Sequence, residues 1–392
     1  MMDIFKKAYE YNAPEQVKKL GLYPFFKEFD SGEGCELTLD GKKIFMMGSN
    51  NYLGLAQDQR VKEASINAIK QYGTGCSGSR FMNGTLKLHI KLEEKLAKFL
   101  NKDACIAFST GFQANLGIIP SVASKGDYII GDRANHASIV EGCRLSFAKL
   151  AKYKHSDMED LERILKSIPE DKGKLIITDG VFSMEGEICK LPEIVELAKK
   201  YNARVMVDDA HGVGVIGPNG RGTAAYFDLE DEVDLIVGTF SKSFASLGGF
   251  VVGSKEVMNH AMHVARSFIF SASIPPSNAA AALEAIKILE EEPERITRVN
   301  ENAKFFKEGL EAIGLECGET ETPIIPIMIY DDMKTFFVTK SLLDNGVYVN
   351  PVIPPAVPEG QSLLRTSVTA TQTKEQLAKI LDIIKMVFTE TE

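Results

Sequence analysis

Two clusters of polar residues follow short β-branched runs in the middle of the chain. Residues 204–207 lead into Asp208-Asp-Ala-His211, and residues 235–237 lead, after a glycine, into Thr239-Phe-Ser-Lys-Ser243. Ligands of a parallel α/β sheet bind outside the carboxyl ends of its strands. We therefore expect Asp208, His211 and Lys242 to face one cleft.

These residue types suit the chemistry of pyridoxal phosphate (PLP). A lysine amine forms a Schiff base with this cofactor, and a carboxylate keeps its pyridine nitrogen protonated, which makes the ring an electron sink. Lys242 and Asp208 supply these two groups. Taken one at a time, they are better explained as a surface lysine and a buried aspartate that caps a helix, so the interpretation depends on their joint pattern.

The phosphate of such a cofactor needs amide donors at the start of a helix. Ser109-Thr-Gly-Phe-Gln113 directly follows the apolar run 104–108 and opens a helical pattern. Gly111 and Phe112 are therefore candidate phosphate ligands. Thr239 and Ser241 add hydroxyl groups beside Lys242.

Two other patterns suggest other ligands but lack the sequence context that those ligands need. Residues 73–78 and 212–217 match G-x-G-x-x-G, but the first follows a helical run and the second leads into the turn residues 218–220. A nicotinamide-binding dehydrogenase is thus a distant alternative. His260 and His263 have helical metal-ligand spacing without an evident third ligand, so we expect no metal site.

The elements that would position these residues alternate along the chain. Between residues 55 and 290, β-branched runs alternate with amphipathic helical runs, which predicts an α/β fold with a mostly parallel central sheet and helices on both faces. The expected strands are 104–108, 128–130, 175–178, 204–207, 235–237 and 250–252, and the expected helices are 58–72, 86–100, 111–123, 138–146, 157–167, 191–201 and 254–265.

Three segments are expected along the chain. Residues 1–50 form an N-terminal extension, with a polar helix over about 3–20 and a hairpin that turns at Asp40-Gly41. Residues 51–290 form a large cofactor-binding domain. Residues 291–392 form a small C-terminal α+β domain; a helical pattern over 278–314, bent near Pro293, crosses the boundary, and a final helix covers 374–388.

Composition excludes several classes of protein. The chain has 392 residues, of which 44% are hydrophobic and 25% charged, as in globular proteins. Its net charge of −9 argues against a nucleic-acid partner. Six cysteines lie far apart without a C-x-x-C pair, which favours the reducing cytoplasm. We expect neither a signal peptide nor a transmembrane segment.

The same motifs resemble those of the α-oxoamine synthases, which are fold-type I PLP enzymes that condense an amino acid with an acyl-CoA. The resemblance covers nearly the whole chain, from residues 48–54 to 364–367. Its most specific parts are Val207-Asp-Asp-Ala-His211, Gly238-Thr-Phe-Ser-Lys-Ser243, Gly180-Val-Phe-Ser-Met-Glu-Gly186 and Phe270-Ser-Ala-Ser-Ile-Pro-Pro276.

Within this family, residues 75–85, 135–139 and 152–158 resemble the branch of soluble bacterial serine palmitoyltransferases. That branch condenses L-serine with palmitoyl-CoA to give 3-ketodihydrosphingosine, CoA and CO₂, the first step of sphingolipid synthesis. Branches that use alanine or glycine, 8-amino-7-oxononanoate synthase and glycine C-acetyltransferase (2-amino-3-ketobutyrate CoA ligase), stay open as alternatives. Lipid-like substrates also allow peripheral contact with a membrane.

The resemblance implies a role for each matched residue around the cofactor ring. Lys242 binds the cofactor covalently and then serves as acid and base, while Asp208 pairs with the pyridine nitrogen. His211 and Ser183 lie near the phenolic oxygen. His136 stacks on the ring and also reaches the carboxylate of the amino acid.

The resemblance also implies how the phosphate is bound and how two subunits meet. Phosphate-binding positions of the family are matched by Gly111, Phe112, Thr239 and Ser241. Ser271 and Ala272 match a loop that reaches the phosphate of the neighbouring subunit. The implied assembly is a homodimer with its active sites at the interface.

Substrate positions are matched less completely. Arg365 matches the arginine that holds the substrate carboxylate, for which a guanidinium offers a bidentate, charge-assisted pair. Asn50 matches a position near that carboxylate. Arg80, Phe81 and Met82 are candidates for the entrance of the acyl-CoA thioester, although packing explains them equally well.

Overall fold

A seven-stranded sheet forms the centre of the larger part of the molecule. The computed structural model describes residues 3–30, 32 and 34–390. In the sheet order β3-β9-β8-β7-β6-β4-β5, the strands from β8 to β5 pair in parallel and β9 runs antiparallel to both neighbours. The strands are β3 Ala104–Phe108, β4 Tyr128–Asp132, β5 Lys149–Tyr153, β6 Lys174–Asp179, β7 Arg204–Asp208, β8 Leu235–Thr239 and β9 Gly249–Gly253.

The mostly parallel sheet is confirmed, and each of the six expected strands forms. Strand β5 was not expected from the sequence; its residues 149–153 read Lys-Leu-Ala-Lys-Tyr. This strand lies at the edge of the sheet with β4 as its neighbour, so only part of it is buried and lysines are tolerated. An edge strand of this kind lacks the continuous apolar run that marks the central strands.

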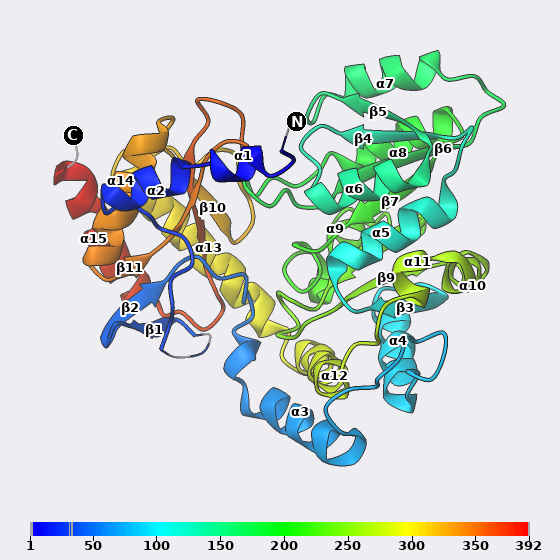
Figure 1. Ribbon diagram of the computed structural model, residues 1–392, viewed down its shortest axis with the longest axis horizontal. Coiled ribbons are helices and arrows are strands. Elements are labelled where there is room, and N and C mark those ends of the chain that lie inside the picture. The colour runs from blue at the N-terminus through cyan, green and yellow to red at the C-terminus, as the bar shows by residue number, and fades with distance from the viewer. Residues whose placement is uncertain (1–2, 31, 33, 391–392) are drawn as a thin grey trace.

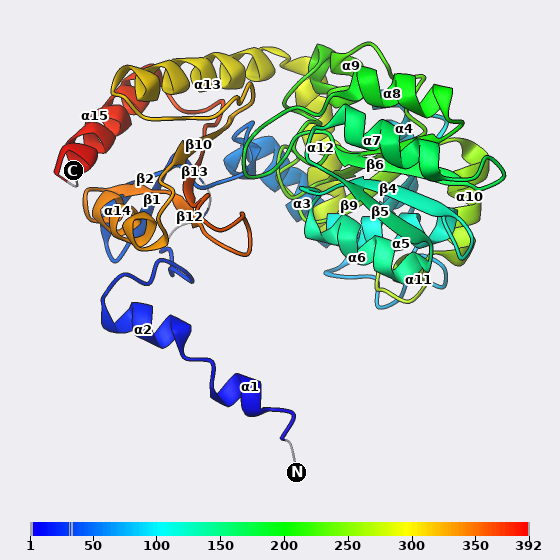
Figure 2. The same ribbon diagram turned by 90° about the horizontal axis from the view of Figure 1, so that it is seen from above.

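Helices cover both faces of this sheet (Figures 1 and 2). Successive side chains of β6 alternate between the two layers: Ile176 packs in the core with α4, α7, α8 and α12, whereas Leu175 and Ile177 pack in the core with α5, α6, α10 and α11. The helices are α3 Gln59–Tyr72, α4 Lys87–Phe99, α5 Gly111–Val122, α6 Ala137–Ser146, α7 Met158–Ser167, α8 Leu191–Lys200, α9 Thr223–Tyr226, α10 Lys255–Val264, α11 Arg266–Ile269 and α12 Pro276–Glu291, with 3₁₀ turns η1 Leu55–Gln57 and η2 Pro218–Gly220.

A smaller part of the molecule follows α12. The expected helical pattern over 278–314 is two helices, because α12 ends at Glu291 and Pro293 caps the start of the next helix, α13. In Figure 2, α13 runs from the large part to the small one. The small part consists of α13 Glu294–Ala312, β10 Ile324–Met328, α14 Asp332–Asp344, β11 Val347–Tyr348, β12 Asn350–Val352, β13 Leu363–Ser367 and α15 Lys374–Glu390, with a sheet in the order β10-β13-β12.

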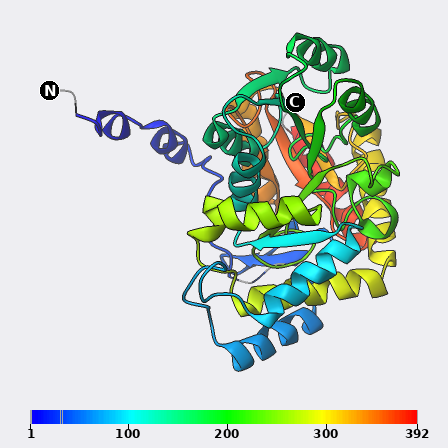
Figure 3. The same cartoon turned by 90° about the vertical axis from the view of Figure 1, so that its right-hand side faces the viewer.

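The N-terminal residues form a projecting arm and then a hairpin. The single helix expected over about 3–20 is wrong: α1 Lys6–Tyr9 and α2 Ala13–Lys19 are separate, because Pro14 lacks the amide that a continuous helix needs. Figures 2 and 3 show this arm extending away from the body. The hairpin of β1 Glu36–Leu39 and β2 Lys42–Met46 forms as expected, and β2 pairs in parallel with β11 of the small part.

None of the helices in the described part of the chain is both long and apolar enough to cross a lipid bilayer.

A close approach of two main-chain segments fixes the start of α5. A Cβ atom on Gly249, the first residue of β9, would lie 2.4 Å from Cα and 2.5 Å from N of Gly111. We expect Gly249→Ala to lower the free energy of unfolding by about 1–3 kcal/mol, because main-chain atoms must move apart. Chemical denaturation measures this change. Gly34→Ala, whose new Cβ would have only an ordinary contact at 3.5 Å, is the matched control; equal stability of the two variants would contradict the prediction.

Candidate active site

The carboxyl ends of three adjacent strands surround a cavity of about 280 Å³. Asp179 of β6, Asp208 of β7 and Val237 of β8 are paired in register, so the three strands end within two residues of one another. The cavity is lined by Thr110, Gly111, Phe112, His136, Ser138, Asp179, Ser183, Asp208, Ala210, His211, Val237, Gly238, Thr239, Ser241 and Lys242. Most of the residues proposed from the sequence thus lie around one space.

Lys242 lies in the loop between β8 and β9 and faces this cavity. Burial lowers the pKa of its amine to about 8; the negative charge of Asp208 opposes the shift and the positive charge of Arg365 adds to it. The described residues offer the amine no hydrogen-bond partner. A partly neutral, unpartnered amine is suited to nucleophilic attack on an aldehyde.

Asp208 is buried, with 6% of its surface exposed. Its Oδ2 accepts a hydrogen bond from Asn115 Nδ2 at 2.6 Å, and its Oδ1 accepts one from the Ala210 amide at 3.1 Å. It forms no ion pair with any described residue. A buried carboxylate without a cationic partner is costly, so this position suits a ligand that brings a positive charge.

The first turn of α5 points at the same cavity. The Thr110 hydroxyl accepts the Gln113 amide at 3.1 Å and so caps the helix, whereas the amides of Gly111 and Phe112 have no acceptor within the helix. Thr239 Oγ1 donates to the Gly248 carbonyl at 3.0 Å and accepts the Ser241 amide at 3.2 Å. These amides and hydroxyls form a cradle that suits a phosphate.

His136 caps the start of α6 and lines the cavity. Its Nδ1 accepts the Ser138 amide at 3.2 Å, and its own amide donates to Asp179 Oδ2 at 2.8 Å. Burial lowers the pKa of His136, so the ring is neutral at pH 7. Burial, followed by the charge of Asp208, raises the pKa of Asp179 well above its usual value.

A hydrogen-bond network joins the cavity to Arg365 on β13. The Tyr52 hydroxyl lies 2.8 Å from His211 Nδ1 and donates to Asn50 Oδ1 at 3.2 Å. Arg365 Nη2 donates to Asn50 Oδ1 at 2.9 Å, and Arg365 Nε donates to the Ser183 carbonyl at 2.5 Å. Burial, with the charges of Lys242 and Arg365, holds the pKa of His211 well below its usual value.

Ser271 and Ala272 do not line this cavity. They contact the segment that begins α5 in the same chain. Ser271 Oγ accepts a hydrogen bond from Gln113 Nε2 at 3.0 Å, and the Ala272 carbonyl accepts one from Ser109 Oγ at 2.5 Å. Arg80 is buried and forms a bidentate ion pair with Glu93 at 2.8 and 2.9 Å, so its guanidinium is held inside the fold by this pair. Phe81 and Met82 are exposed.

Four residues around the site were not predicted: Tyr52, Asn115, Ser138 and Asp179. Asp179 had a usable signal, since it follows an expected strand as Asp208 does. Tyr52 lies inside the matched segment 48–54 but had no assigned role. Ser138 likewise lies inside the matched segment 135–139 without an assigned role, whereas Asn115 lies within a helix, where nothing in the sequence distinguishes it from an ordinary polar residue.

The two patterns set aside in the sequence have structural explanations. Gly212 belongs to a loop packed against the buried Asp209, and a Cβ there would lie 2.0 Å from Asp209 Oδ1. This glycine therefore makes room for a carboxylate, and no helix starts in residues 212–217. His260 bonds to the Ser121 carbonyl at 3.1 Å, and His263 bonds to the Asn259 carbonyl at 2.7 Å.

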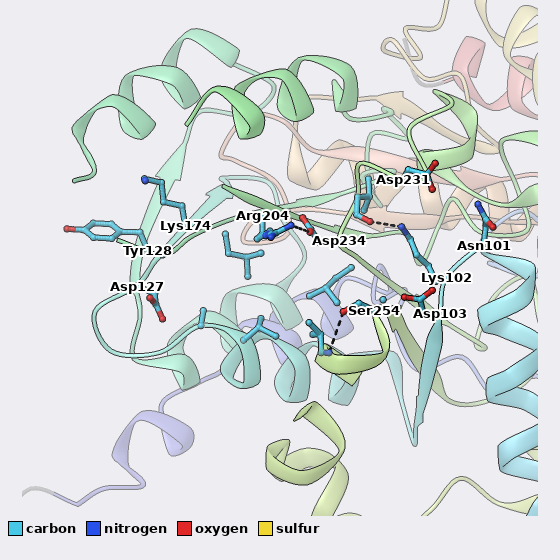
Figure 4. Close-up of a pocket in the computed structure, with 18 residues that line it drawn as sticks. Asn101, Lys102, Asp103, Asp127, Tyr128, Lys174, Arg204, Asp231, Asp234 and Ser254 are labelled. Carbon is cyan, nitrogen blue, oxygen red and sulfur yellow. Dashed lines mark hydrogen bonds and ion pairs between the residues drawn. The ribbon is translucent and has the colours of Figure 1, made fainter. Parts of the chain in front are cut away.

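A second cavity of about 660 Å³ lies at the opposite end of the sheet (Figure 4). It is bounded by the first residues of several strands, and two of its basic side chains already have acceptors. Arg204 pairs with Asp234 at 2.8 Å, and Lys102 donates to the Val233 carbonyl at 2.7 Å. None of the residues proposed for catalysis lines this cavity.

Residues 42–384 match the family model described as aminotransferase class I and II. The chain belongs to this family. Among curated members it is 50% identical to the serine palmitoyltransferase of Sphingobacterium spiritivorum over 382 residues, which cover 97% of this chain and 96% of that protein. It is 46% identical to the 8-amino-7-oxononanoate synthase of Thermosipho melanesiensis over 363 residues, which cover 93% of each.

Among solved members of the family, a serine palmitoyltransferase from S. paucimobilis with a bound PLP–myriocin aldimine has the same fold. It superposes with a TM-score of 0.97, is 37% identical in sequence, and the match covers 99% of both chains. The fold-type I architecture expected from the sequence is therefore confirmed.

The lowered pKa of Lys242 predicts a pH dependence for covalent attachment of PLP to the cofactor-free protein. Attachment requires the neutral amine, and with a pKa of about 8 the neutral fraction rises about tenfold between pH 7 and pH 9. Borohydride trapping followed by mass spectrometry measures the initial rate. Lys242→Ala should show no attachment at any pH. A rate that is flat between pH 7 and 9, or that still rises steeply above pH 10, would contradict the assignment.

Proposed function

We propose that the protein is a PLP-dependent acyltransferase that condenses L-serine with palmitoyl-CoA. The products are 3-ketodihydrosphingosine, CoA and CO₂. The observation that carries the proposal is the cavity shared by the Lys242 amine and the buried Asp208, which forms no ion pair with any residue that the structure describes, with Arg365 held beside it. The relatives that are serine palmitoyltransferases over the full length of the chain support the choice of substrates.

The residues around the cavity fit PLP. Lys242 would hold the cofactor covalently, Asp208 would keep the proton on its pyridine nitrogen, and the amides of Gly111 and Phe112 with Thr239 and Ser241 would bind its phosphate. His136 would cover the ring, while His211 and Ser183 would lie near its phenolic oxygen. When bound, PLP draws electrons away from the carbon that bears the amino group and so acidifies its proton.

Arg365 is the proposed site for the substrate carboxylate. Its Nε and Nη1 are fixed by the Ser183 carbonyl and Ser367 Oγ, and Asn50 accepts from Nη2. This anchoring leaves the orientation of the guanidinium little freedom, so a carboxylate meets a preorganised, charge-assisted partner.

Proton transfer at the substrate carbon is assigned to Lys242. With a pKa near 8, its amine can accept a proton near neutral pH and return it later. The neutral ring of His136 can donate a hydrogen bond from Nε2, since its Nδ1 already accepts the Ser138 amide. His136 can therefore orient a carboxylate or a carbonyl oxygen without adding charge.

A second candidate is the same chemistry with alanine or glycine and a shorter acyl-CoA. The 46% identity to an 8-amino-7-oxononanoate synthase favours keeping this candidate, because both kinds of relative match nearly the whole chain.

We further propose a homodimer in which Ser271 and Ala272 reach the partner's site, a location in the cytoplasm, and three segments at 1–50, 51–290 and 291–392. Six free cysteines support the reducing location.

Release of CoA distinguishes the two candidates. Purified holoenzyme is incubated with serine, alanine or glycine, each combined with acyl-CoA donors from acetyl to palmitoyl, and free thiol is measured. We expect rapid release with serine and palmitoyl-CoA, and none from Lys242→Ala. Faster release with alanine or glycine and a short donor would replace the proposal by the second candidate.

Replacement of Arg365 tests the proposed carboxylate site. Lysine keeps the charge but loses the guanidinium fork, so Arg365→Lys should raise KM for the amino acid by about 10- to 100-fold, the value of one or two charged hydrogen bonds. KM for the acyl-CoA should change little. Arg163→Lys, at an exposed ion pair on α7, is the control. An unchanged KM for the amino acid in Arg365→Lys would contradict the assignment.

A further inference from the structure

A short hairpin over residues 180–189 lies between the two parts of the molecule and carries Ser183. Val181 and Ile188 form an antiparallel bridge. The Phe182 amide donates to the Glu187 carbonyl at 2.9 Å, and the Cys189 amide donates to the Gly180 carbonyl at 3.0 Å. The hairpin is therefore a defined structural unit.

One side of this hairpin contacts the small part. The Ser183 carbonyl accepts from Arg365 Nε at 2.5 Å. The Gly186 carbonyl accepts from the hydroxyls of Thr320 and Thr322 at 3.2 and 3.0 Å. The position of Arg365 thus depends on where the hairpin lies.

The other side is held by His155, from the loop between β5 and α7. His155 Nδ1 lies 3.0 Å from Asp132 Oδ1 at the end of β4, and His155 Nε2 lies 2.6 Å from Glu187 Oε2 in the hairpin. The imidazole also packs against the buried Phe182 ring in a T-shaped arrangement, with centroids 4.4 Å apart. One imidazole therefore connects the central sheet to the hairpin.

The contacts of both nitrogens with carboxylates indicate that His155 is an imidazolium. Burial lowers its pKa, but the hydrogen bonds that it donates to Asp132 and Glu187, together with their charges, outweigh burial and raise the pKa to about 10. Glu185 is the other acidic group that acts on it from the hairpin, and Lys190 acts on Glu187. We call the two contacts of His155 with Asp132 and Glu187 the clamp. Because the pKa of His155 is shifted upward, the clamp is intact below the usual pKa of histidine and is lost as the pH rises through about 10.

We propose that His155 is a positioning residue for the substrate carboxylate: its imidazolium fixes the 180–189 hairpin, and the Ser183 carbonyl in turn fixes Arg365. This inference rests on the proposed function of Arg365. His155 itself does not line the active-site cavity. Its loss should therefore weaken amino-acid binding and leave proton transfer at Lys242 largely intact.

The first test is steady-state kinetics of holoenzyme carrying His155→Gln. We expect KM for the amino acid to rise about tenfold while kcat changes by less than about threefold. Glu187→Gln, which keeps the shape of the clamp but removes one charge, should shift KM in the same direction by less, and it serves as the working variant if His155→Gln does not fold. Arg163→Gln, which removes an exposed ion pair on α7, should leave both constants unchanged. A roughly tenfold fall in kcat with an unchanged KM for the amino acid would overturn the proposal.

A double-mutant cycle tests whether His155 acts through Arg365. If it does, adding His155→Gln or Glu187→Gln to Arg365→Lys should raise KM for the amino acid much less than it does in the wild-type background. Multiplicative effects on KM would overturn the proposed route. A histidine carbon resonance that titrates near pH 10 and is missing from His155→Gln would support the clamp, and titration near pH 6.5 would overturn it.

Amide hydrogen exchange separates this inference from the proposed function, because it requires no turnover. His155→Gln or Glu187→Gln should speed exchange in peptides that cover residues 180–189 and leave α7 and α8 unchanged. If the wild-type holoenzyme turned out to use no amino acid, the proposed function would fail, while this measurement would still decide the clamp. Unchanged exchange in the hairpin would overturn it.

Discussion

The buried carboxylate of Asp208 is the constraint around which the candidate active site is organised. It lies at the end of a central strand, is held by one side-chain amide and one main-chain amide, and forms no ion pair with a described residue. Such a charge is stable in a protein interior only when something compensates it. The cavity in front of it also holds the Lys242 amine, and the helix start of α5 borders the same space. Compensation by a protonated pyridine, as proposed for PLP, would explain why these groups occur together.

The two parts of the molecule contribute different chemistry to this site. The large sheet supplies the groups that fit the cofactor, because three strand ends and one helix start converge there. The small part supplies Arg365, which reaches the site from β13. Tyr52 and Asn50, from a segment before the first helix of the large part, join the two through hydrogen bonds. In the proposed function, the guanidinium that would hold the carboxylate and the groups that would hold the cofactor therefore come from different elements.

Much of this arrangement could be predicted from the sequence, for identifiable reasons. The central strands are buried on both faces and so appear as apolar runs, and the polar residues that follow them mark the edge where ligands bind. What the sequence hid depends on contacts between distant segments. Asn115 is one polar residue in a helix until folding places it 2.6 Å from Asp208, and His155 had no visible partner until β4 and the hairpin surrounded it. Pro14 can be read from the sequence as a break, but the helical pattern on either side of it led to the expectation of one continuous helix.

The contact between Arg365 and Ser183 uses a main-chain carbonyl as the acceptor. Any amino acid at position 183 presents that oxygen, so replacing the serine side chain would leave the contact in place. A substitution scan would consequently detect this interaction not at its own position but at the residues that shape the hairpin. Sequence variation at 183 likewise carries no information about how the guanidinium is held, and a comparison of side chains alone would miss half of the pair.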